Sequence, residues 1–420
     1  MGMCSIVYAF TKRFRNESWM PLATFVYVMG HFVYRLFQIQ IISVIHEKLI
    51  LNFQHIDPST PMMLMVLRLT TFAWNVYDGT LRDEDVISSI RHKVVKEFPS
   101  LIEFFGYTMF FPTFVTGPSL DFMDYREYIN ETGAFQKIPS RIWPTLQCVG
   151  LGLFFCGIYA VYMDTYSYLF MSTSEFVDNF NIWQRIYYCQ MSGIVARAKY
   201  YGIFKMAEGV CNLVGIGYTG NGVWNRGQGV SIRDVEFGQS FKQLLDNWNM
   251  KTARWLRNCI YIRFTNQKRL AGGKKQSTSF VTFVTFMVSA LWHGFHAGYY
   301  LTFGVGAMFP ILARSMRRYF RPLILEPSSL AWMKPLYDLL GWFFTWTSLN
   351  FVAAPFVVWQ LEKSLAVWGS LHYYAVIVLI SGFVLVDGVG GGKWILKNVG
   401  KQVGVENVST RSKQVPKKEN

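Results

Sequence analysis

The sequence predicts an all-α polytopic membrane protein, and three observations lead to that class. Hydrophobic residues make up 51% of the 420 residues, and aromatic residues make up 17%. Charged residues account for only 16%, whereas an ordinary soluble domain carries about 25%. The apolar residues also come in long blocks that contain no charge. So much apolar surface excludes disordered and fibrous proteins, and the blocks argue against a soluble enzyme.

Four uncharged blocks are long enough to cross a bilayer, which takes about 17–25 apolar residues per helix. They are Pro144–Met163, Gln276–Ala313, Leu339–Leu361 and Leu365–Val386. The second has 38 residues, enough for one span and most of another. Weaker candidates are Ser18–His46, Pro58–Tyr77, Leu101–Leu120 and a stretch that ends near Tyr218. We therefore expect about 8–11 membrane-embedded helices, some of them short or broken.

No repeat and no linker rich in Pro or Ser divides the apolar blocks. Residues 1–390 are therefore expected to form one membrane-embedded domain, and residues 391–420 a basic, disordered, cytosolic tail. Two polar segments, Asp78–Ser100 and Asp124–Arg141, are expected to be loops, the first with a short helix. The glycine-rich segment Gly215–Gly229 is also expected to be a loop, because no strand precedes it as a phosphate-binding fingerprint requires.

The net charge of +15 indicates orientation rather than nucleic-acid binding, because the basic residues lie between apolar blocks. Lys242–Lys275 carries nine Lys or Arg residues against one acidic residue. Other basic clusters lie in Arg314–Arg321 and in the tail. Basic loops tend to stay in the cytosol, so these segments and the C-terminus should face it. They either serve only topology and attraction to anionic lipids, or they also form a docking surface for a phosphorylated ligand.

The cysteines and the termini bear on the cellular compartment. Six cysteines show no paired spacing, so the sequence predicts no disulfide framework and no metal site. The N-terminus has no cleavage pattern of a removable signal peptide. Lys417 and Lys418, close to the C-terminus, resemble the dilysine retrieval signal of endoplasmic-reticulum membrane proteins. We therefore expect a multi-pass protein of that membrane.

The 38-residue uncharged block contains His293, preceded by a run apolar enough to be a helix in lipid. An ionisable residue at membrane depth is costly and therefore suggests a function. Histidine suits proton transfer, because its ordinary pKa near 6.5 makes it an effective base at cellular pH. A packing histidine bonded to a carbonyl oxygen is the alternative. His296 is expected to be a supporting neighbour.

A second candidate lies upstream, in Phe241–Phe264, which has the period of an amphipathic helix with a basic polar side. Asn249 is a neutral amide within the apolar stripe of this helix. A buried amide must find a partner, and it can donate a hydrogen bond to the carbonyl oxygen of a substrate. The alternative is a hydrogen bond between helices. A base and an amide donor beside a basic face meet the needs of acyl transfer.

Several motifs in order resemble the membrane-bound O-acyltransferase family, and within it the lysophospholipid acyltransferases of broad-specificity fungal type. Trp248-Asn249-Met250 and the later Trp292-His293-Gly294 carry the resemblance at the proposed site. The segments Leu69–Gly79, Pro99–Tyr107 and Gly117–Phe122 resemble early signatures of the same branch. Ala297 departs from the pattern, because many relatives have proline there. The resemblance runs from about residue 18 to residue 388.

The resemblance implies a buried reaction chamber, with His293 as the catalytic histidine and Asn249 as its paired asparagine. It implies direct transfer of a fatty acyl group from acyl-CoA to the free hydroxyl of a lysophospholipid, with no metal and no cofactor beyond this co-substrate. The residues expected to shape the site are Trp248, Trp292, Gly294 and Tyr299. The residues expected to hold the CoA phosphates are Lys251, Arg254 and Arg257.

Two alternatives stay open at this point. One is an acyltransferase of the same family that acts on a neutral lipid or a protein. The other is a transporter or scaffold without enzymatic activity, although transporters often contain repeats and this sequence shows none. The lipid headgroup, the glycerol position, the preferred acyl chain and the oligomeric state do not follow from the sequence.

Overall fold

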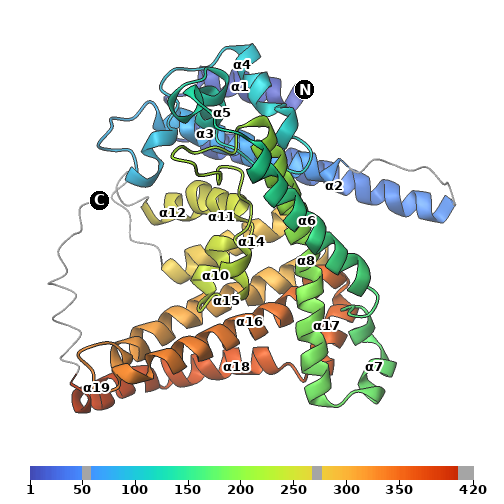
Figure 1. Ribbon diagram of the computed structural model, residues 1–420, viewed down its shortest axis with the longest axis vertical. Coiled ribbons are helices and arrows are strands. Elements are labelled where there is room, and N and C mark those ends of the chain that lie inside the picture. The colour runs from blue at the N-terminus through green and yellow to red at the C-terminus, as the bar shows by residue number, and fades with distance from the viewer. Residues whose placement is uncertain (50–57, 267–276, 405–420) are drawn as a thin grey trace. The chain divides into compact units, whose positions relative to one another are not determined.

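The computed structural model describes residues 1–49, 58–266 and 277–404, and these residues are largely helical (Figure 1). Within the described ranges the only β pairing is an isolated bridge between Gly220 and Val223. The predicted all-α class is confirmed. A helix satisfies its backbone polar groups within one segment, which is what a chain in lipid requires.

The elements follow one another with short connections. The α-helices are α1 Gly2–Arg13, α2 Met20–Leu49, α3 Ser59–Asp78, α4 Leu101–Thr108, α5 Phe122–Ile129, α6 Ile142–Tyr162, α7 Ser174–Asn179, α8 Ile182–Val214, α9 Ile232–Glu236, α10 Phe241–Asn247, α11 Met250–Leu256, α12 Ile262–Asn266, α14 Thr278–His293, α15 Ala297–Phe320, α16 Lys334–Val358, α17 Leu361–Ser370, α18 Tyr374–Gly382 and α19 Gly391–Gln402. The 3-10 turns are η1 Ser88–Lys93, η2 Phe111–Thr113, η3 Gly133–Gln136, η4 Phe170–Ser172, η6 Arg321–Ile324 and η7 Ala331–Met333. Two π-helical turns are η5 Arg257–Tyr261 and η8 Phe383–Gly388.

Most of the apolar blocks form the expected helices, and two do not. Helices α6 and α16 fill two of the blocks, and α14 and α15 divide the 38-residue block. The block Leu365–Val386 is not one helix, because the chain bends by 81° between α17 and α18. The candidate Leu101–Leu120 yields only the eight-residue α4. Pro112 and Pro118 lie in its second half, and proline has no N–H to donate to a continuing helix.

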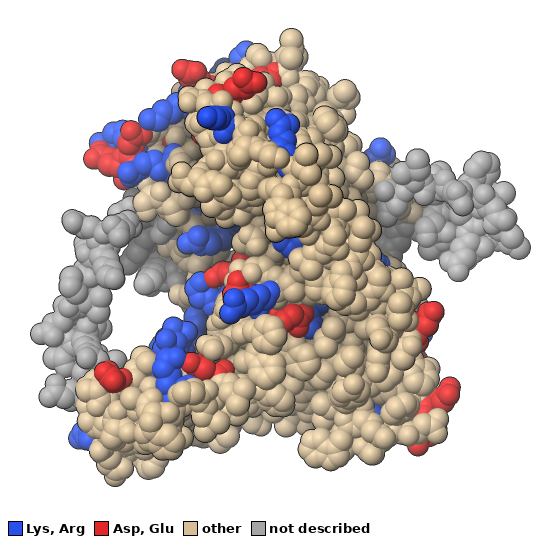
Figure 2. Space-filling view, viewed as in Figure 1, with Lys and Arg blue, Asp and Glu red and all other residues tan. Residues whose placement is uncertain are grey.

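Three helices in the described part of the chain are long and apolar enough to cross a membrane: Met20–Ile39, Ile142–Tyr162 and Ala331–Val358. The bent pair of α17 with α18 and η8 raises this number to four if it counts as one span. Wide areas of the visible surface carry no charge (Figure 2). The chain is thus a multi-pass membrane protein, while the total of about 8–11 embedded helices stays a prediction.

The segments outside these spans contain two departures from expectation. The predicted loop Asp124–Arg141 is partly helical, since α5 extends to Ile129 and η3 follows it. The tail predicted to be disordered from residue 391 begins with helix α19. Lys417 and Lys418 lie outside the described residues.

The chain divides into two compact units. Unit 1 comprises residues 1–164, 195–232 and 246–295, and unit 2 comprises residues 165–194, 233–245 and 296–420. The prediction of one domain over residues 1–390 is not tested by this division, because two compact units can belong to one domain. Each unit is described separately.

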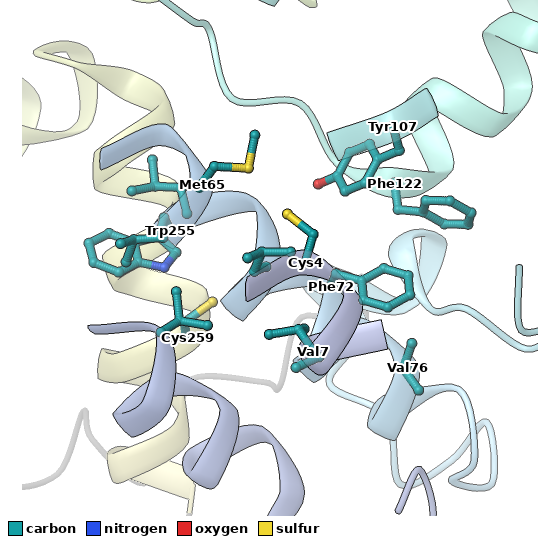
Figure 3. Close-up of a cluster of buried hydrophobic side chains, with 14 of the residues drawn as sticks. Cys4, Val7, Met65, Phe72, Val76, Tyr107, Phe122, Trp255 and Cys259 are labelled. Atoms are coloured by element: carbon teal, nitrogen blue, oxygen red, sulfur yellow. The ribbon is translucent and has the colours of Figure 1, made fainter. Parts of the chain in front are cut away.

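Unit 1 is built around α3. The side chains of Leu67, Leu69, Phe72 and Val76 on this helix are buried, with 0–1% of their surface exposed. Figure 3 shows Phe72 in the hydrophobic core of this unit. Its ring centroid lies 5.0 Å from that of Phe104. Close packing of this kind holds α3 in one position. The positions of neighbouring segments can therefore be described by the α3 residues that they contact.

In unit 2, α15 packs against α16, and a strained turn joins α16 to α17. Trp359 has φ 70° and ψ −46°. The N–H of Gln360 donates to the carbonyl oxygen of Val358 at 2.9 Å, which closes a γ-turn of the rare strained form. The carbonyl oxygen of Trp359 accepts from the N–H of Gly298 at 2.9 Å. A Cβ on Gly298 would lie only 2.0 Å from the Pro355 oxygen, so this contact requires glycine.

Candidate active site

Two tryptophans tie the segments that carry His293 and Asn249 to α3. The indole N–H of Trp292, next to His293, donates to the carbonyl oxygen of Met63 at 3.1 Å. The indole N–H of Trp255, on α11, donates to the hydroxyl of Thr70 at 2.9 Å. The two indole rings lie 5.9 Å apart between centroids. Both bonds are neutral and lie within unit 1.

These contacts place His293 and Asn249 at similar heights along α3. Trp255 contacts Thr70 and Arg263 contacts Asp78, so the chain from α11 to α12 runs parallel to α3. Asn249 precedes Trp255 by about six residues, or about 9 Å of helix rise. Met63 precedes Thr70 by about seven residues, or about 10 Å. Asn249 therefore lies near the level of Met63, where Trp292 holds the end of α14.

His293 is the last residue of α14. Its ring meets the Trp292 ring edge to face, with centroids 4.6 Å apart. Gly294 follows with φ 123° and ψ −161°, a conformation that L side chains rarely adopt. The Gly294 N–H donates to the carbonyl oxygens of Ala290 and Leu291, each at 3.2 Å. The sequence thus ends the helix directly after the histidine, and a glycine is needed to do so.

Asn249 lies at a break in the chain, which corrects the prediction of one continuous helix over Phe241–Phe264. Helix α10 ends at Asn247 and α11 starts at Met250, with Asn249 between them at φ 41° and ψ 58°. Asparagine tolerates this left-handed conformation better than most residues. The backbone is held there because the Met250 N–H donates to the Gly229 oxygen at 2.7 Å.

The side chain of Asn249 is the feature of the site that suggests chemistry. It makes no capping hydrogen bond to α11. Within the part of the chain that the structure describes, we find no hydrogen bond from its amide to another residue. The side chain is half-buried. An amide without a protein partner is open to a hydrogen bond with water or a ligand, which suits a group that meets a substrate.

Trp248 supports the break at Asn249 from the side of α8. Its ring meets those of Tyr200, Tyr201 and Phe204 edge to face, with centroids 5.8–6.0 Å apart. Gly229, which holds Met250, packs against Phe204 as well. Trp248 is therefore packed on α8 directly beside Asn249, and its role in shaping a site stays a prediction.

The three predicted phosphate-binding residues differ in their surroundings. Arg254 and Arg257 are exposed. Lys251 is half-buried, and its ammonium donates to the carbonyl oxygen of Arg226. Burial, together with the charge of Arg254, lowers the pKa of Lys251 to about 8. Helix α11, with seven residues, is too short to span a bilayer.

Tyr299 belongs to unit 2, and so does His296. Tyr299 packs against Phe356, with ring centroids 4.9 Å apart. His296 is stacked on Trp359 at 5.3 Å, with the two ring planes 16° apart. His293 and His296 are thus held in different ways although only two residues separate them. Eight of the nine predicted site residues lie in unit 1, and Tyr299 does not.

Sequence reasoning did not single out the residues that position the site. Trp255 and Thr70 fix α11, and Asp78 and Arg263 fix its continuation through bonds of 2.7 and 2.5 Å. The guanidinium of Arg263 also lies over the ring of Trp74, 4.1 Å from its centroid. Asp78 at the end of a predicted span was the available signal, because a carboxylate there needs a cationic partner.

Comparison with known proteins finds a matching family and several similar proteins. The family model described as the membrane-bound O-acyltransferase family matches residues 43–354, which include Asn249 and His293. The lysophospholipid acyltransferase of Schizosaccharomyces pombe is 31% identical over 386 residues, covering 88% of this chain and 73% of that protein. The lysophospholipid acyltransferase of Saccharomyces cerevisiae is 30% identical over 413 residues, covering 90% of this chain and 64% of that protein.

An animal protein is similar to the same extent. Human membrane-bound glycerophospholipid O-acyltransferase 2 is 32% identical over 350 residues, covering 77% of this chain and 64% of that protein. The matched part of this chain therefore spans about two thirds of the length of these relatives.

Proposed function

Because the chain belongs to the membrane-bound O-acyltransferase family, we propose that it transfers a fatty acyl group from acyl-CoA to the free hydroxyl of a lysophospholipid. The products are a diacyl phospholipid and CoA, as in phospholipid synthesis and remodelling. The printed names of the fungal and human relatives support this substrate class. The single structural observation that carries the proposal is the amide of Asn249, which has no partner among the described residues and lies level with the end of α14.

In the proposed reaction, His293 acts as general base. It takes the proton from the hydroxyl of the lysophospholipid while that oxygen attacks the thioester carbon of acyl-CoA. The amide of Asn249 donates a hydrogen bond to the thioester oxygen, where negative charge develops. The carbon–sulfur bond then breaks, and the thiolate of CoA takes the proton from His293. The acyl group passes directly to the lipid, without an acyl-enzyme.

The substrates approach from two phases in this proposal. The lysophospholipid comes from the bilayer, and acyl-CoA comes from water. Arg254 and Arg257 follow Asn249 in the sequence and are exposed, so they can offer charge to the CoA phosphates, and Lys251 adds a third cation. Trp248, Trp292, Gly294 and Tyr299 shape the site. The reaction needs no metal and no cofactor besides acyl-CoA as co-substrate.

We also propose that the protein resides in the membrane of the endoplasmic reticulum with its C-terminus in the cytosol. The support is the basic character of Lys242–Lys275 and of the tail, together with Lys417 and Lys418 near the C-terminus. Its partners are then cytosolic acyl-CoA, the lysophospholipid and the bilayer.

The proposal is tested by acyl transfer in membranes that contain this chain. Labelled oleoyl-CoA is supplied with a panel of lysophospholipids that differ in headgroup, and the labelled diacyl product is measured. We expect transfer to at least one lysolipid, and no transfer above background for His293→Ala at equal expression. His296→Ala is the matched control, because it removes a histidine from the same segment and should keep most of the activity.

Three outcomes would contradict the proposal. Wild-type turnover in His293→Ala would remove the proposed base. An equal loss in His293→Ala and His296→Ala would point to a local folding defect in this segment. Transfer to a sterol or diacylglycerol in place of every lysophospholipid would move the chain to another substrate class within the same family.

A further inference from the structure

A hollow of about 240 Å³ lies in unit 1, at the end of α3 remote from Met63. Its floor is buried, because Val76 and Val95 expose only 1% and 3% of their surface. Its rim carries Arg15, Asn16 and Lys96. Neither the proposed base nor its paired asparagine lines the hollow, and Met63 and Gly79 are about 24 Å apart along α3. The hollow is therefore distinct from the candidate active site.

The floor of this hollow is rigid. The N–H of Val95 donates to the carbonyl oxygen of Asn75 at 2.9 Å, which fastens the segment before Lys96 to the last turn of α3. A Cβ added to Gly79 would lie 2.2 Å from the Val95 oxygen, so the two backbones touch. The Thr80 hydroxyl is bonded to the Tyr77 oxygen at 2.7 Å. A preformed floor means that a ligand at the rim need not order the protein.

The charges at the rim favour an anion. Among the described residues we find no ion pair or hydrogen bond for the guanidinium of Arg15. The ammonium of Lys96 is 2.9 Å from a carboxylate oxygen of Asp83, and this bond lowers the pKa of Asp83, which keeps that carboxylate ionised. Lys96 is thus shared, while Arg15 is available. An arginine suits a phosphate, because its planar fork matches two oxygens of the group.

The position of the hollow favours a lipid as the source of the phosphate. Arg15 and Asn16 lie just before Met20, where the first candidate span begins. Trp19, between them and the span, is 48% exposed. Tryptophan and basic residues beside a span mark the level of the lipid headgroups. A volume of about 240 Å³ is also below the roughly 300–1,000 Å³ of pockets that bury drug-sized ligands, so the hollow suits a headgroup better than a nucleotide.

We propose that this hollow binds the phosphate of a phospholipid headgroup at the membrane surface, with Arg15 as its principal cation and Lys96 and Asn16 as further donors. The site is separate from acyl transfer and would hold a lipid that is not being acylated. Asp83 opposes binding, because it occupies the ammonium of Lys96.

The test measures lipid retention by the full chain, purified in detergent, with native mass spectrometry. The probe is dioleoyl phosphatidic acid, and dioleoylglycerol is the same lipid without the phosphate. We expect retention of phosphatidic acid and not of dioleoylglycerol. Arg15→Gln should weaken retention about fivefold, the factor that corresponds to about 1 kcal/mol per basic residue near an anionic surface. Asp83→Asn should strengthen it, since Lys96 is then released.

Matched variants make the result decisive. Arg13→Gln removes the same charge from the same segment but outside the hollow, and should leave retention unchanged. An equal loss in Arg13→Gln and Arg15→Gln would show diffuse charge attraction and overturn the proposal. So would unchanged retention in Arg15→Gln. The gain expected for Asp83→Asn cannot come from misfolding, and unchanged retention in this variant would contradict the role assigned to Lys96.

Two further measurements are needed. One distinguishes a lipid phosphate from free phosphate, and the other distinguishes this proposal from the proposed acyl transfer. Inorganic phosphate at millimolar concentration should not displace the lipid. If it does, the hollow is a site for free phosphate and the assignment to a lipid is wrong. His293→Ala should retain phosphatidic acid as the wild type does. Failure of acyl transfer would therefore leave this site standing, and loss of lipid binding would leave the proposed reaction standing.

Discussion

The two ends of α3 use different chemistry. Toward its N-terminal end and at its middle, the Met63 oxygen and the Thr70 hydroxyl accept neutral indole N–H groups from Trp292 and Trp255. At its C-terminal end, the carboxylate of Asp78 meets the guanidinium of Arg263 in two bonds. The hollow with Arg15 lies at this second end. Met63 and Asp78 are about 22 Å apart along the helix.

This difference suggests that the residues that stabilise the fold and the residues proposed to act in the reaction lie at different parts of α3. A neutral hydrogen bond fixes geometry without adding a charge of its own to the site, whereas a further cation or carboxylate would change the energy of a charged intermediate. An ion pair can hold two segments strongly once it is buried, because loss of one partner leaves the other charge uncompensated. The comparison predicts stability defects at one end of α3 and activity defects at the other.

The largest expected effect is at the charged end. Asp78→Asn should lower the free energy of unfolding by about 3–5 kcal/mol, because Arg263 would lose its carboxylate in a site where Asp78 exposes 2% of its surface. The measurement is the unfolding midpoint of the purified chain in denaturant. Arg263→Gln should have a similar effect.

The double variant sharpens this prediction. Asp78→Asn combined with Arg263→Gln should be less destabilised than the sum of the single variants, because the pair acts as a unit. Activity per folded molecule should change little in all three. Two results would contradict the contrast between the two ends of α3. One is that the losses of unfolding free energy in the single variants simply add in the double variant, and the other is that turnover falls while stability does not.

The next effect is at the reaction end. Asn249→Ala should lower kcat by about 100- to 1,000-fold, or about 2.7–4 kcal/mol, as expected for a lost donor to the thioester oxygen. Alanine also tolerates the left-handed conformation poorly, so Asn249→Gly is the matched variant, since glycine adopts φ 41° without strain. Both variants should lose activity equally. Recovery in Asn249→Gly would assign the role of Asn249 to its backbone.

The two tryptophans should show a smaller and graded effect. Trp292→Phe and Trp255→Phe each remove one indole donor, which is worth about 0.5–1.5 kcal/mol of stability. Trp292 adjoins His293, so Trp292→Phe should also lower kcat severalfold, whereas Trp255→Phe should act mainly on the unfolding midpoint. Turnover and denaturation curves of the two purified variants distinguish the two effects. An unchanged kcat in Trp292→Phe would show that this bond does not position the base.

The sequence predicted the helical class well because uncharged blocks report burial in lipid directly. It did not predict where the helices stop. Leu365–Val386 is apolar throughout, yet it bends by 81° between α17 and α18. Phe241–Phe264 keeps a helical period of apolar residues across a break at Asn249. The spacing of apolar residues indicates which side chains face the core. A single residue in the left-handed region changes the direction of the chain without changing that spacing.

The proposed catalytic pair followed from the cost of polar groups at membrane depth and from the family motifs. The residues that position the pair could not be predicted, because Met63 and Trp292 meet only in the folded chain. The position of Tyr299 could not be predicted either. It follows His293 by six residues in the sequence, yet it belongs to the other compact unit.

The smallest expected effect concerns Lys251, the cation closest to Asn249 in sequence. Its pKa is lowered to about 8, so it is charged at pH 7 and loses its proton as the pH rises through that value. If it contacts a CoA phosphate, KM for acyl-CoA should rise roughly two- to fivefold between pH 7 and pH 9, the range expected for an ion pair worth up to about 1 kcal/mol. Lys251→Arg stays charged over this range and should abolish the rise. A rise that persists in Lys251→Arg would assign the titration to another group and leave CoA binding to Arg254 and Arg257.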